Sequence, residues 1–410
     1  MQRRQFNQAL AAAGITAGLA PFSIVRAQSQ KLKVGVLLPR SGVQAFTGQS
    51  CQKGVDLAPE VLKQVLGVDI EIMNADTESN ADTARTRAER LIQEGAHVLV
   101  GAFDSGHTAA IAQVAEQRGI PHIINVAAAP QITEQGYKFV FRNFPTAPEL
   151  VSNGLRLMGD VFRATNTAPR TCVYMHVNDT FGQANTNAIR AILPRLDFLP
   201  FKIVDTIAYD PAAKDLTVEV SKAKATGADF LLLVCRTNDA IILRREMAKQ
   251  RWNPMGIMSP GSPGLYEEQF TKALGPLAEY VICNTVWFNP KTEMTRTVAA
   301  AFKKRNPKDL LDFHGVNAGY TFDAIMIAAD AFKRARSTDP KALADAIRQT
   351  NIPVANRMSL GGPIKFNAKG QVEGNYSASI QNLKGKPTVV LPTELAEAKV
   401  VFPEPNYKKS

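Results

Sequence analysis

The chain is poor in the residues that build metal centres and disulfide frameworks. It has four Cys and five His in 410 residues. No two Cys form a Cys-x-x-Cys pair, and the His lack the spacing of metal ligands. Three of the Cys (Cys172, Cys235 and Cys283) fall in expected buried strands, where we expect small apolar side chains. A Cys172–Cys235 disulfide is compatible with an exported protein, but nothing in the sequence supports it.

Motifs of common catalytic sites are also missing. The sequence contains no His-Glu-x-x-His, no Gly-x-Ser-x-Gly and no Walker phosphate loop. No Gly-x-Gly-x-x-Gly follows a strand, which disfavours a dinucleotide site. Ser50-x-x-Lys53 matches one short catalytic pattern, but its partner motifs are absent and it lies on an ordinary amphipathic stretch. We therefore expect no catalytic residue, no metal and no cofactor.

Long apolar runs are absent beyond the first residues of the chain. A twin-arginine pair (Arg3-Arg4) precedes an Ala- and Gly-rich apolar run over 9–20, and a cleavage site ends at Ala27. This layout predicts an export signal of the Tat type, cleaved after about Ala27. The alternative, a membrane anchor, is disfavoured because the run is too short. We therefore expect a periplasmic protein that does not insert into the membrane.

Acidic residues are fewer than basic ones, which gives a formal net charge of +11. The expected signal carries three Arg and no acid, so the net charge falls to +8 after cleavage. No stretch interleaves basic and aromatic residues, so we expect no nucleic-acid partner. The basic excess fits solvated helix faces, although a positive field also favours anionic ligands.

One pattern of elements occurs twice in the chain. An apolar strand over 33–39 leads to a helical stretch, a second strand, and then a Gly-Ala pair that enters the strand 97–101. The order recurs from Arg170, and Gly227 opens the second such unit 132 residues after Gly95. Apolar strands entered through Gly-Ala after a charged helix are typical of parallel sheets covered by helices. The repeat predicts an α/β protein with two Rossmann-like lobes and a ligand cleft between them.

The expected strands also point to a ligand site. Ligands of parallel sheets bind at the carboxyl ends of strands, beside helix N-termini. Ser105-Gly106-His107 would present a hydroxyl and free backbone N–H groups at a helix start, which suits a carboxylate. The simpler alternative is that Asp104 or Ser105 only caps this helix, and both can hold together. The loops selected in this way are 40–48, 104–108, 126–130, 178–182, 236–239 and 259–264.

The sequence also predicts the structure of three later segments. The helix expected over 314–335 has an apolar stripe at Val316 and Tyr320, which we interpret as core rather than as a ligand site. We expect a closing hairpin from strands 364–366 and 376–380, with its turn near Gly370. The residues from 396 to 410 are expected to form a C-terminal tail.

In combination these features resemble the periplasmic solute-binding proteins of ABC importers, in the branch that includes the leucine/isoleucine/valine-binding protein. The resemblance extends from about residue 31 to 391. Each of the motifs behind this resemblance is weak alone, but their order and spacing are specific. The motifs are Lys33–Gly42, Gly48, Gly54, Asp76, Gly95–Gly101, Ile120-Pro121, Ala127–Pro130, Phe141-Arg142, Phe181-Gly182, Gly227–Asp229 and Phe322–Ala324.

The resemblance implies a type I periplasmic binding protein with three hinge segments. Ligand binding would close the hinge, and the closed form would dock on a membrane permease as a monomer. The expected crossings lie near 142–147, 283–288 and 358–363. The expected parts are a signal over 1–27, a first lobe over 28–145 and 286–360, a second lobe over 146–285 and 361–395, and the tail.

The resemblance also assigns roles to individual loops. It implies that the serine loop at Ser105 holds a ligand carboxylate. A Thr and an acid of the family, which hold an α-ammonium, are replaced here by Ala128 and by the acid-free loop around Gly261. The aromatic lid is Phe181 rather than Tyr, and Arg236 stands where a neutral or weakly basic residue is usual.

These departures change the expected ligand. A buried ammonium without an acceptor is costly, so we predict a small organic acid without an α-amino group. Ser105 and Arg236 would bind its carboxylate, and an aromatic or aliphatic body would lie on apolar side chains. The predicted ligand-binding residues are Ser41, Phe46, Thr47, Ser105, Gly106, His107, Ala127, Ala128, Ala129, Phe181, Arg236 and Gly261.

Other functions remain open from the sequence. Asp104 or Asp179 would replace the lost acid if the ligand is a branched-chain amino acid or an amide. A periplasmic sensor of the same fold is a second alternative, and an exported enzyme is disfavoured by the missing catalytic motifs.

Overall fold

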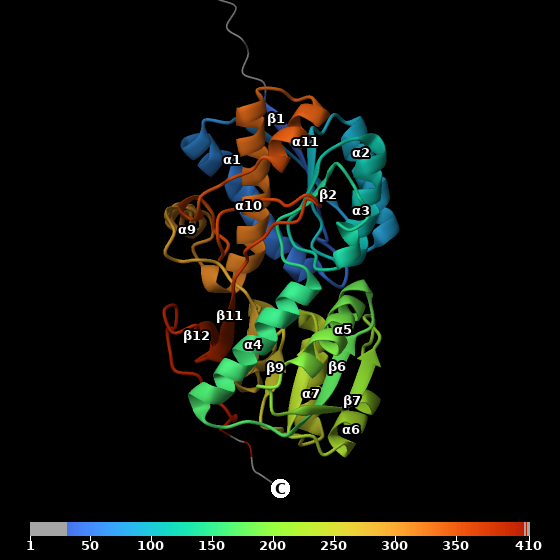
Figure 1. Ribbon diagram of the computed structural model, residues 1–410, viewed down its shortest axis with the longest axis vertical. Helices are drawn as coiled ribbons and strands as arrows, with labels where there is room; N and C mark the ends of the chain where they lie inside the picture. Colours follow the sequence, from blue (N-terminus) through green and yellow to red (C-terminus); the bar gives the residue numbers. More distant parts are fainter. Residues whose placement is uncertain (1–30, 406, 408–410) are drawn as a thin grey trace, which may run out of the picture. The chain divides into compact units, whose positions relative to one another are not determined.

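The computed structural model of the protein describes residues 31–405 and residue 407. These residues form two α/β lobes, each built on its own sheet (Figure 1). The expected export signal over 1–27 lies outside the described residues. Within the described part of the chain, no helix is both long enough and apolar enough to cross a membrane.

The first sheet is entirely parallel, with the strand order β2-β1-β3-β4-β5. The inner strand β1 buries every side chain except Lys33, which is half-buried, because helices cover both faces of the sheet. Strands covered on both faces are continuous apolar runs rather than alternating ones. The strands are β1 (Leu32–Leu38), β2 (Ile70–Asp76), β3 (Val98–Gly101), β4 (His122–Ile124) and β5 (Val140–Arg142).

Helices α2 and α3 cover one face of this sheet, and α1 and α10 cover the other (Figure 1). Asn80 caps α2 by accepting two backbone N–H groups. The helices of this lobe are α1 (Ala45–Leu66), α2 (Ala81–Gln93), α3 (Ser105–Arg118), α9 (Glu293–Arg305), α10 (Leu311–Ala335) and α11 (Pro340–Arg348).

Helices α1 and α10 approach each other closely at Gly54. A Cβ atom added at this position would lie 2.1 Å from the backbone oxygen of Ala318. We expect Gly54→Ala to lower the free energy of unfolding by about 2 kcal/mol, because backbone atoms must move apart to admit the methyl group. Chemical denaturation measures this effect.

Gly362→Ala is the matched control, because the nearest atom to its added Cβ is 3.8 Å away. Its unfolding midpoint should stay within error of the unaltered protein. Equal stability of both variants would show that the two helices separate without cost.

The second sheet is mixed, with the order β12-β11-β10-β9-β8-β6-β7. Strands β6 to β10 are parallel, whereas β11 and β12 are antiparallel to their neighbours. The strands are β6 (Thr171–Val177), β7 (Lys202–Tyr209), β8 (Phe230–Val234), β9 (Ile257–Ser259), β10 (Ile282–Val286), β11 (Ser377–Leu383) and β12 (Lys386–Leu391).

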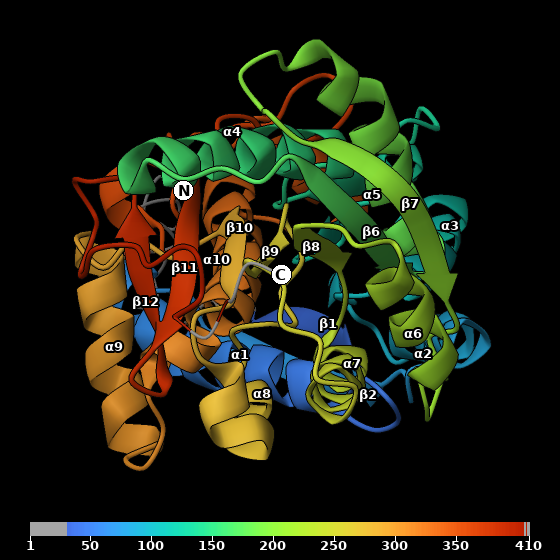
Figure 2. The ribbon, with the colours of Figure 1, turned by 90° about the horizontal axis from the view of Figure 1, so that it is seen from below.

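Helices α4 and α5 pack on one face of the second sheet, and α6 and α7 lie on the other (Figure 2). The helices are α4 (Ala147–Thr165), α5 (Thr180–Ile192), α6 (Thr217–Ala225), α7 (Thr237–Lys249) and α8 (Glu268–Leu274). Short 3-10 turns lie at Pro130–Ile132, Leu193–Arg195, Gly275–Ala278 and Val354–Asn356.

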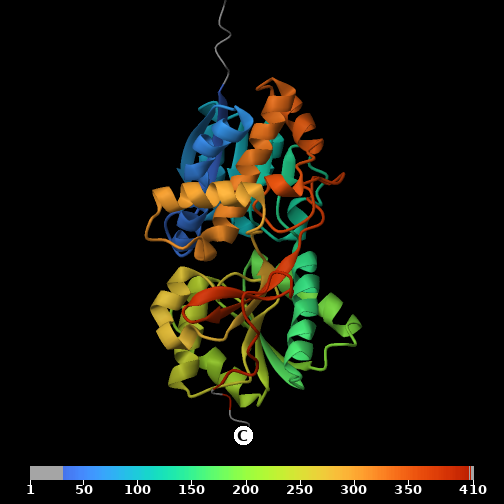
Figure 3. The same ribbon diagram turned by 90° about the vertical axis from the view of Figure 1, so that its left-hand side faces the viewer.

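The closing hairpin expected around Gly370 is right only in part. Phe366 bridges antiparallel to Val372 across a turn at Gly370, but most of the expected second strand, 376–380, belongs to β11. The regular hairpin is formed by β11 and β12, red in Figure 3, which pair from Leu383 with Lys386 outward. Its two loop residues, Lys384 and Gly385, both have positive φ, of 56° and 75°. Two such residues make the tight turn that matches the twist of antiparallel strands. The sequence hid this turn because Lys is unusual at its first position.

Two segments pack differently from the expected lobe scheme. The segment 361–372, expected in the second lobe, bridges from Ile364 to Ile352 and from Gln371 to Arg142. The start of the expected tail is part of the second lobe: Phe402 is buried with its ring centroid 5.4 Å from that of Phe162. The exact lobe boundaries stay a prediction.

Candidate functional site

A cavity lies among residues that follow the strands of both sheets. About 480 Å³ of space not filled by protein atoms lies within it and at its mouth. Its lining residues are Phe103, Ser105, Val126, Ala127, Ala128, Phe144, Phe181, Arg236, Gly261, Pro263, Tyr266, Thr285, Val286, Val316 and Asn317.

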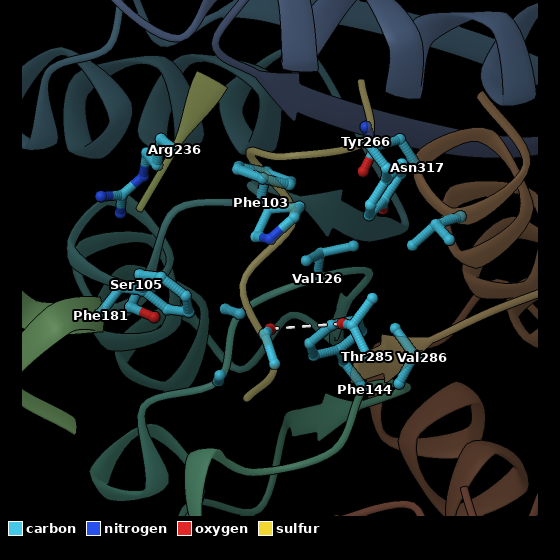
Figure 4. A pocket seen from close by; sticks show the side chains of 15 residues that line it. Phe103, Ser105, Val126, Phe144, Phe181, Arg236, Tyr266, Thr285, Val286 and Asn317 are labelled. Carbon is cyan, nitrogen blue, oxygen red and sulfur yellow. Dashed lines mark hydrogen bonds between the residues drawn. The ribbon is translucent and has the colours of Figure 1, made fainter. Parts of the chain in front are cut away.

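The cavity has apolar walls and polar groups on two sides. Figure 4 shows Ser105 and Arg236 on one side, and Tyr266 and Asn317 on the other. Phenyl, valine and alanine side chains supply most of the surface between them. Among the described residues that line the cavity, none is Asp or Glu.

The backbone at Phe103 holds one aromatic wall in place. Phe103 has φ 77°, in the left-handed region that a bulky residue rarely adopts. Its N–H donates to Asn125 Oδ1 at 3.1 Å, and its side chain is 7 % exposed. A strained backbone of this kind persists only where its surroundings fix it, which suits a ligand site.

The helix start at Ser105 is capped by Asp104. Asp104 Oδ1 accepts the backbone N–H groups of Gly106 at 2.8 Å and of His107 at 3.3 Å. The expectation that these N–H groups are free for a ligand is therefore wrong, because the capping carboxylate satisfies them. Ser105 Oγ accepts the N–H of Ala129 at 3.4 Å, which leaves its own O–H free to donate into the cavity.

Arg236 joins the two lobes through its guanidinium. Its Nη2 pairs with Asp104 of the first lobe and its Nη1 with Asp179 of the second. The same guanidinium lies 5.1 Å from the centroid of the Phe181 ring. Burial opposes ionisation of Asp104, but Arg236, His107 and the hydrogen bonds to the carboxylate together outweigh it and lower the pKa of Asp104 to about 2. Arg236 therefore lines the cavity as expected, but both of its terminal nitrogens already have acidic partners.

A buried acid that the sequence did not reveal lies close to the cavity. Glu267 is 0 % exposed and accepts hydrogen bonds from Thr47 at 3.3 Å, from Asn317 at 3.0 Å and from Thr237. Burial raises the pKa of Glu267, although these three donors act in the opposite direction. Its oxygens are thus committed to protein groups of both lobes.

Six of the twelve predicted ligand residues line the cavity: Ser105, Ala127, Ala128, Phe181, Arg236 and Gly261. The other six do not: Ser41, Phe46, Thr47, Gly106, His107 and Ala129.

The six outside the cavity wall have other contacts, and that of Gly106 is the N–H bond to Asp104 described above. Ser41 is exposed and donates its N–H to Asp76. The Phe46 ring lies 6.4 Å from that of His314, and Thr47 binds Glu267. His107 is buried beside Asp104, 3.9 Å away, and the Ala129 carbonyl accepts from Arg142 at 2.7 Å.

Several residues that line the cavity were not predicted as ligand-binding residues from the sequence. Val316 was interpreted as core, which is wrong in part, because the stripe of α10 that packs on α1 also reaches the cavity. Thr285 and Val286 lie in an expected crossing, and crossing segments between lobes also form the floor of a cleft. Val126 and Pro263 lie in loops selected from the sequence, and Phe144 lies in an expected crossing, but none of them was singled out. No sequence signal marks Phe103, Tyr266 or Asn317.

The Cys residues are free and buried, and none of the four is paired with another. Burial raises the pKa of Cys51 to about 12, so its thiol stays protonated. In the described residues, no group of three or more His, Cys, Asp and Glu is arranged to hold a metal ion.

Comparisons with known proteins agree with this architecture. A model of the family described as periplasmic binding protein matches residues 31–384. A relative from Brucella suis biovar 1, named Leu/Ile/Val-binding protein homolog 7, is 24% identical over 412 residues, covering 97% of this chain and 98% of the relative.

Two solved structures share the fold. A leucine binding protein from Thermotoga maritima has a TM-score of 0.75 and 21% identity, covering 87% of this chain and 97% of that one. A solute binding protein of an ABC transporter from R. palustris, in complex with benzoate, has a TM-score of 0.72 and 20% identity, covering 90% and 100%. The resemblance and the fold class inferred from the sequence are confirmed.

Proposed function

The chain belongs to the periplasmic binding protein family, and on this premise we propose that it binds a small organic acid without an α-amino group. The ligand occupies the cavity between the lobes and is delivered to the membrane permease of an ABC importer. The protein acts in the periplasm as a monomer, binds its ligand without chemical change and needs no cofactor.

One observation supports this choice of ligand above the others: no Asp or Glu is among the described residues that line the cavity. The neighbouring acids are already occupied, Asp104 and Asp179 by Arg236 and Glu267 by three uncharged donors. An α-ammonium buried here would have no counter-charge, which costs several kcal/mol. A carboxylate at the same place meets the free O–H of Ser105, beside Arg236, whose terminal nitrogens are paired with Asp104 and Asp179.

Closure of the lobes accompanies binding. Residues of both lobes line the cavity, and the Arg236–Asp104 pair joins the lobes beside it. A ligand that contacts both walls favours the closed arrangement over the open one by its additional contacts. The permease then distinguishes the closed protein from the open one.

Ser105→Ala tests the carboxylate end of the cavity. We expect it to weaken the binding of an aromatic or aliphatic acid about tenfold, because the lost hydroxyl donates to a charged acceptor. Calorimetry with the acid and with its methyl ester measures the effect. The ester should bind at least about tenfold more weakly than the acid to the unaltered protein, and Ser105→Ala should reduce this difference.

Ser41→Ala is the matched control, because Ser41 is exposed and does not line the cavity. It should leave both affinities unchanged. Tight binding of leucine or valine, with no response to any organic acid, would overturn the proposal.

A branched-chain amino acid is the second candidate, favoured by the names of the Brucella and Thermotoga proteins. It requires that an acid near the cavity leave its present partners to meet the ammonium. Mass spectrometry of the ligand that co-purifies with the mature protein separates the two candidates directly.

A further inference from the structure

Two polar groups on the far side of the cavity have no protein partner. The Tyr266 hydroxyl and Asn317 Oδ1 make no hydrogen bond with any of the described residues. Both residues line the cavity, and each is 1 % exposed. A buried polar atom left unpaired costs about 1–3 kcal/mol, so such atoms in a cavity wall indicate where a ligand supplies the partner.

The structure fixes the orientation of both groups. Asn317 Nδ2 donates to Glu267 Oε1 at 3.0 Å, which leaves the amide oxygen as the free atom. The Tyr266 ring packs edge-on against Trp287, with centroids 5.4 Å apart, so its hydroxyl has a defined position. Figure 4 shows Tyr266 and Asn317 on the same side of the cavity, across from Ser105 and Arg236.

The chemistry of the two free atoms restricts what they can bind. Asn317 Oδ1 only accepts hydrogen bonds, whereas the Tyr266 hydroxyl both donates and accepts. A ligand hydroxyl satisfies both, because it donates to Asn317 and accepts from Tyr266. An ether or a ketone has no proton to donate, so it leaves Asn317 unpaired.

A ligand ammonium fits this place less well. It would donate to both oxygens, but its charge needs a counter-charge in a buried site. Glu267 is the nearest acid along the chain, and its carboxyl oxygens already accept three hydrogen bonds. The hydroxyl is therefore the favoured group.

We propose that Tyr266 and Asn317 form a second polar subsite, which binds a hydroxyl group at the end of the ligand opposite its carboxylate. This inference rests on the proposed function, in which the carboxylate lies near Ser105. It narrows the ligand class to hydroxylated carboxylic acids whose apolar body separates the two polar groups. In an α-amino acid both polar groups are on one carbon, so they cannot span the cavity.

Paired ligands test the subsite. The probes are benzoate, phenylacetate and 3-phenylpropanoate, each compared by calorimetry with its 4-hydroxy derivative. We expect at least one hydroxy acid to bind about tenfold more tightly than its parent acid. Trp287 fluorescence gives a second readout, because its ring contacts Tyr266.

Tyr266→Phe removes only the hydroxyl and should abolish this preference, while the parent acid keeps its affinity or gains slightly. Tyr320→Phe is the matched control. Tyr320 is 0 % exposed and its hydroxyl is also unpaired, but it does not line the cavity. The control should keep the full preference for the hydroxy acid.

The outcomes separate the subsite from the proposed function. Organic acids that bind with no preference for the hydroxyl would overturn the subsite and leave the proposed function standing. If no acid binds, or methyl esters bind equally well, both are overturned. Tighter binding of 4-(aminomethyl)benzoate than of any hydroxy acid would show that this end takes a cation, and would also overturn the subsite.

Discussion

Replacing Arg236 with methionine is expected to weaken the binding of an organic acid about a hundredfold, which is a loss of about 2.7 kcal/mol. The variant removes the charged side chain that lines the cavity and leaves Asp104 and Asp179 without their partner. Two carboxylates would then repel the carboxylate of the ligand in a poorly hydrated site. Calorimetry with the tightest-binding acid measures the loss.

Two further variants identify the cause of this loss. Asp179→Asn in the Arg236→Met background should recover part of the affinity, because Asn keeps the helix cap and removes one repelling charge. Arg244→Met is the control: Arg244 is a buried Arg paired with Glu404, outside the cavity wall. It should lower stability without changing the affinity. An Arg236→Met protein that binds acids normally would contradict the assigned polarity of the site.

Arg142→Met should lower the free energy of unfolding by about 4 kcal/mol, because it leaves several buried acceptors unpaired. The Arg142 guanidinium is buried and donates to the carbonyls of Ala127 at 3.2 Å and Ala129 at 2.7 Å. It also donates to Gln371 at 2.6 Å, and to Thr133. Burial lowers the pKa of Arg142 to about 10, so it is still charged at neutral pH. Urea denaturation followed by circular dichroism measures the change.

The same substitution should also affect binding, because Ala127 is part of the cavity wall. We expect about a tenfold loss of affinity for the acid ligand at temperatures where the variant is folded. Arg244→Met again provides the comparison, since it removes a buried Arg that does not hold this loop. Unchanged affinity in Arg142→Met would mean that the loop keeps its shape without the guanidinium.

The sequence predicted the sheets well where strands are buried on both faces. The expected strands 97–101, 171–177 and 229–234 correspond closely to β3, β6 and β8. Each is a continuous apolar run after a charged helix, and two of them follow a Gly-Ala pair. Such runs report burial directly, because only a strand covered on both sides tolerates them.

The cavity was predicted only in part, because its polar chemistry depends on contacts between distant residues. Glu267 meets Thr47, Thr237 and Asn317, which are far apart in the sequence. Tyr266 and Asn317 come from a loop and from α10, and no local pattern connects them. The sequence also did not show that Asp104 and Asp179 both pair with the guanidinium of Arg236. This arrangement forms only when the two lobes come together.

The interleaved strand and helix order has a consequence for biosynthesis. Helix α10, which covers the first sheet, is synthesised only after ten of the twelve strands of the described residues, β1 to β10. The second sheet is completed by β11 and β12, close to the end of translation. Nascent chains up to residue 310 therefore expose apolar surface of both lobes, and neither core closes first. Newly made protein depends on chaperones or on delayed collapse until its last hundred residues emerge.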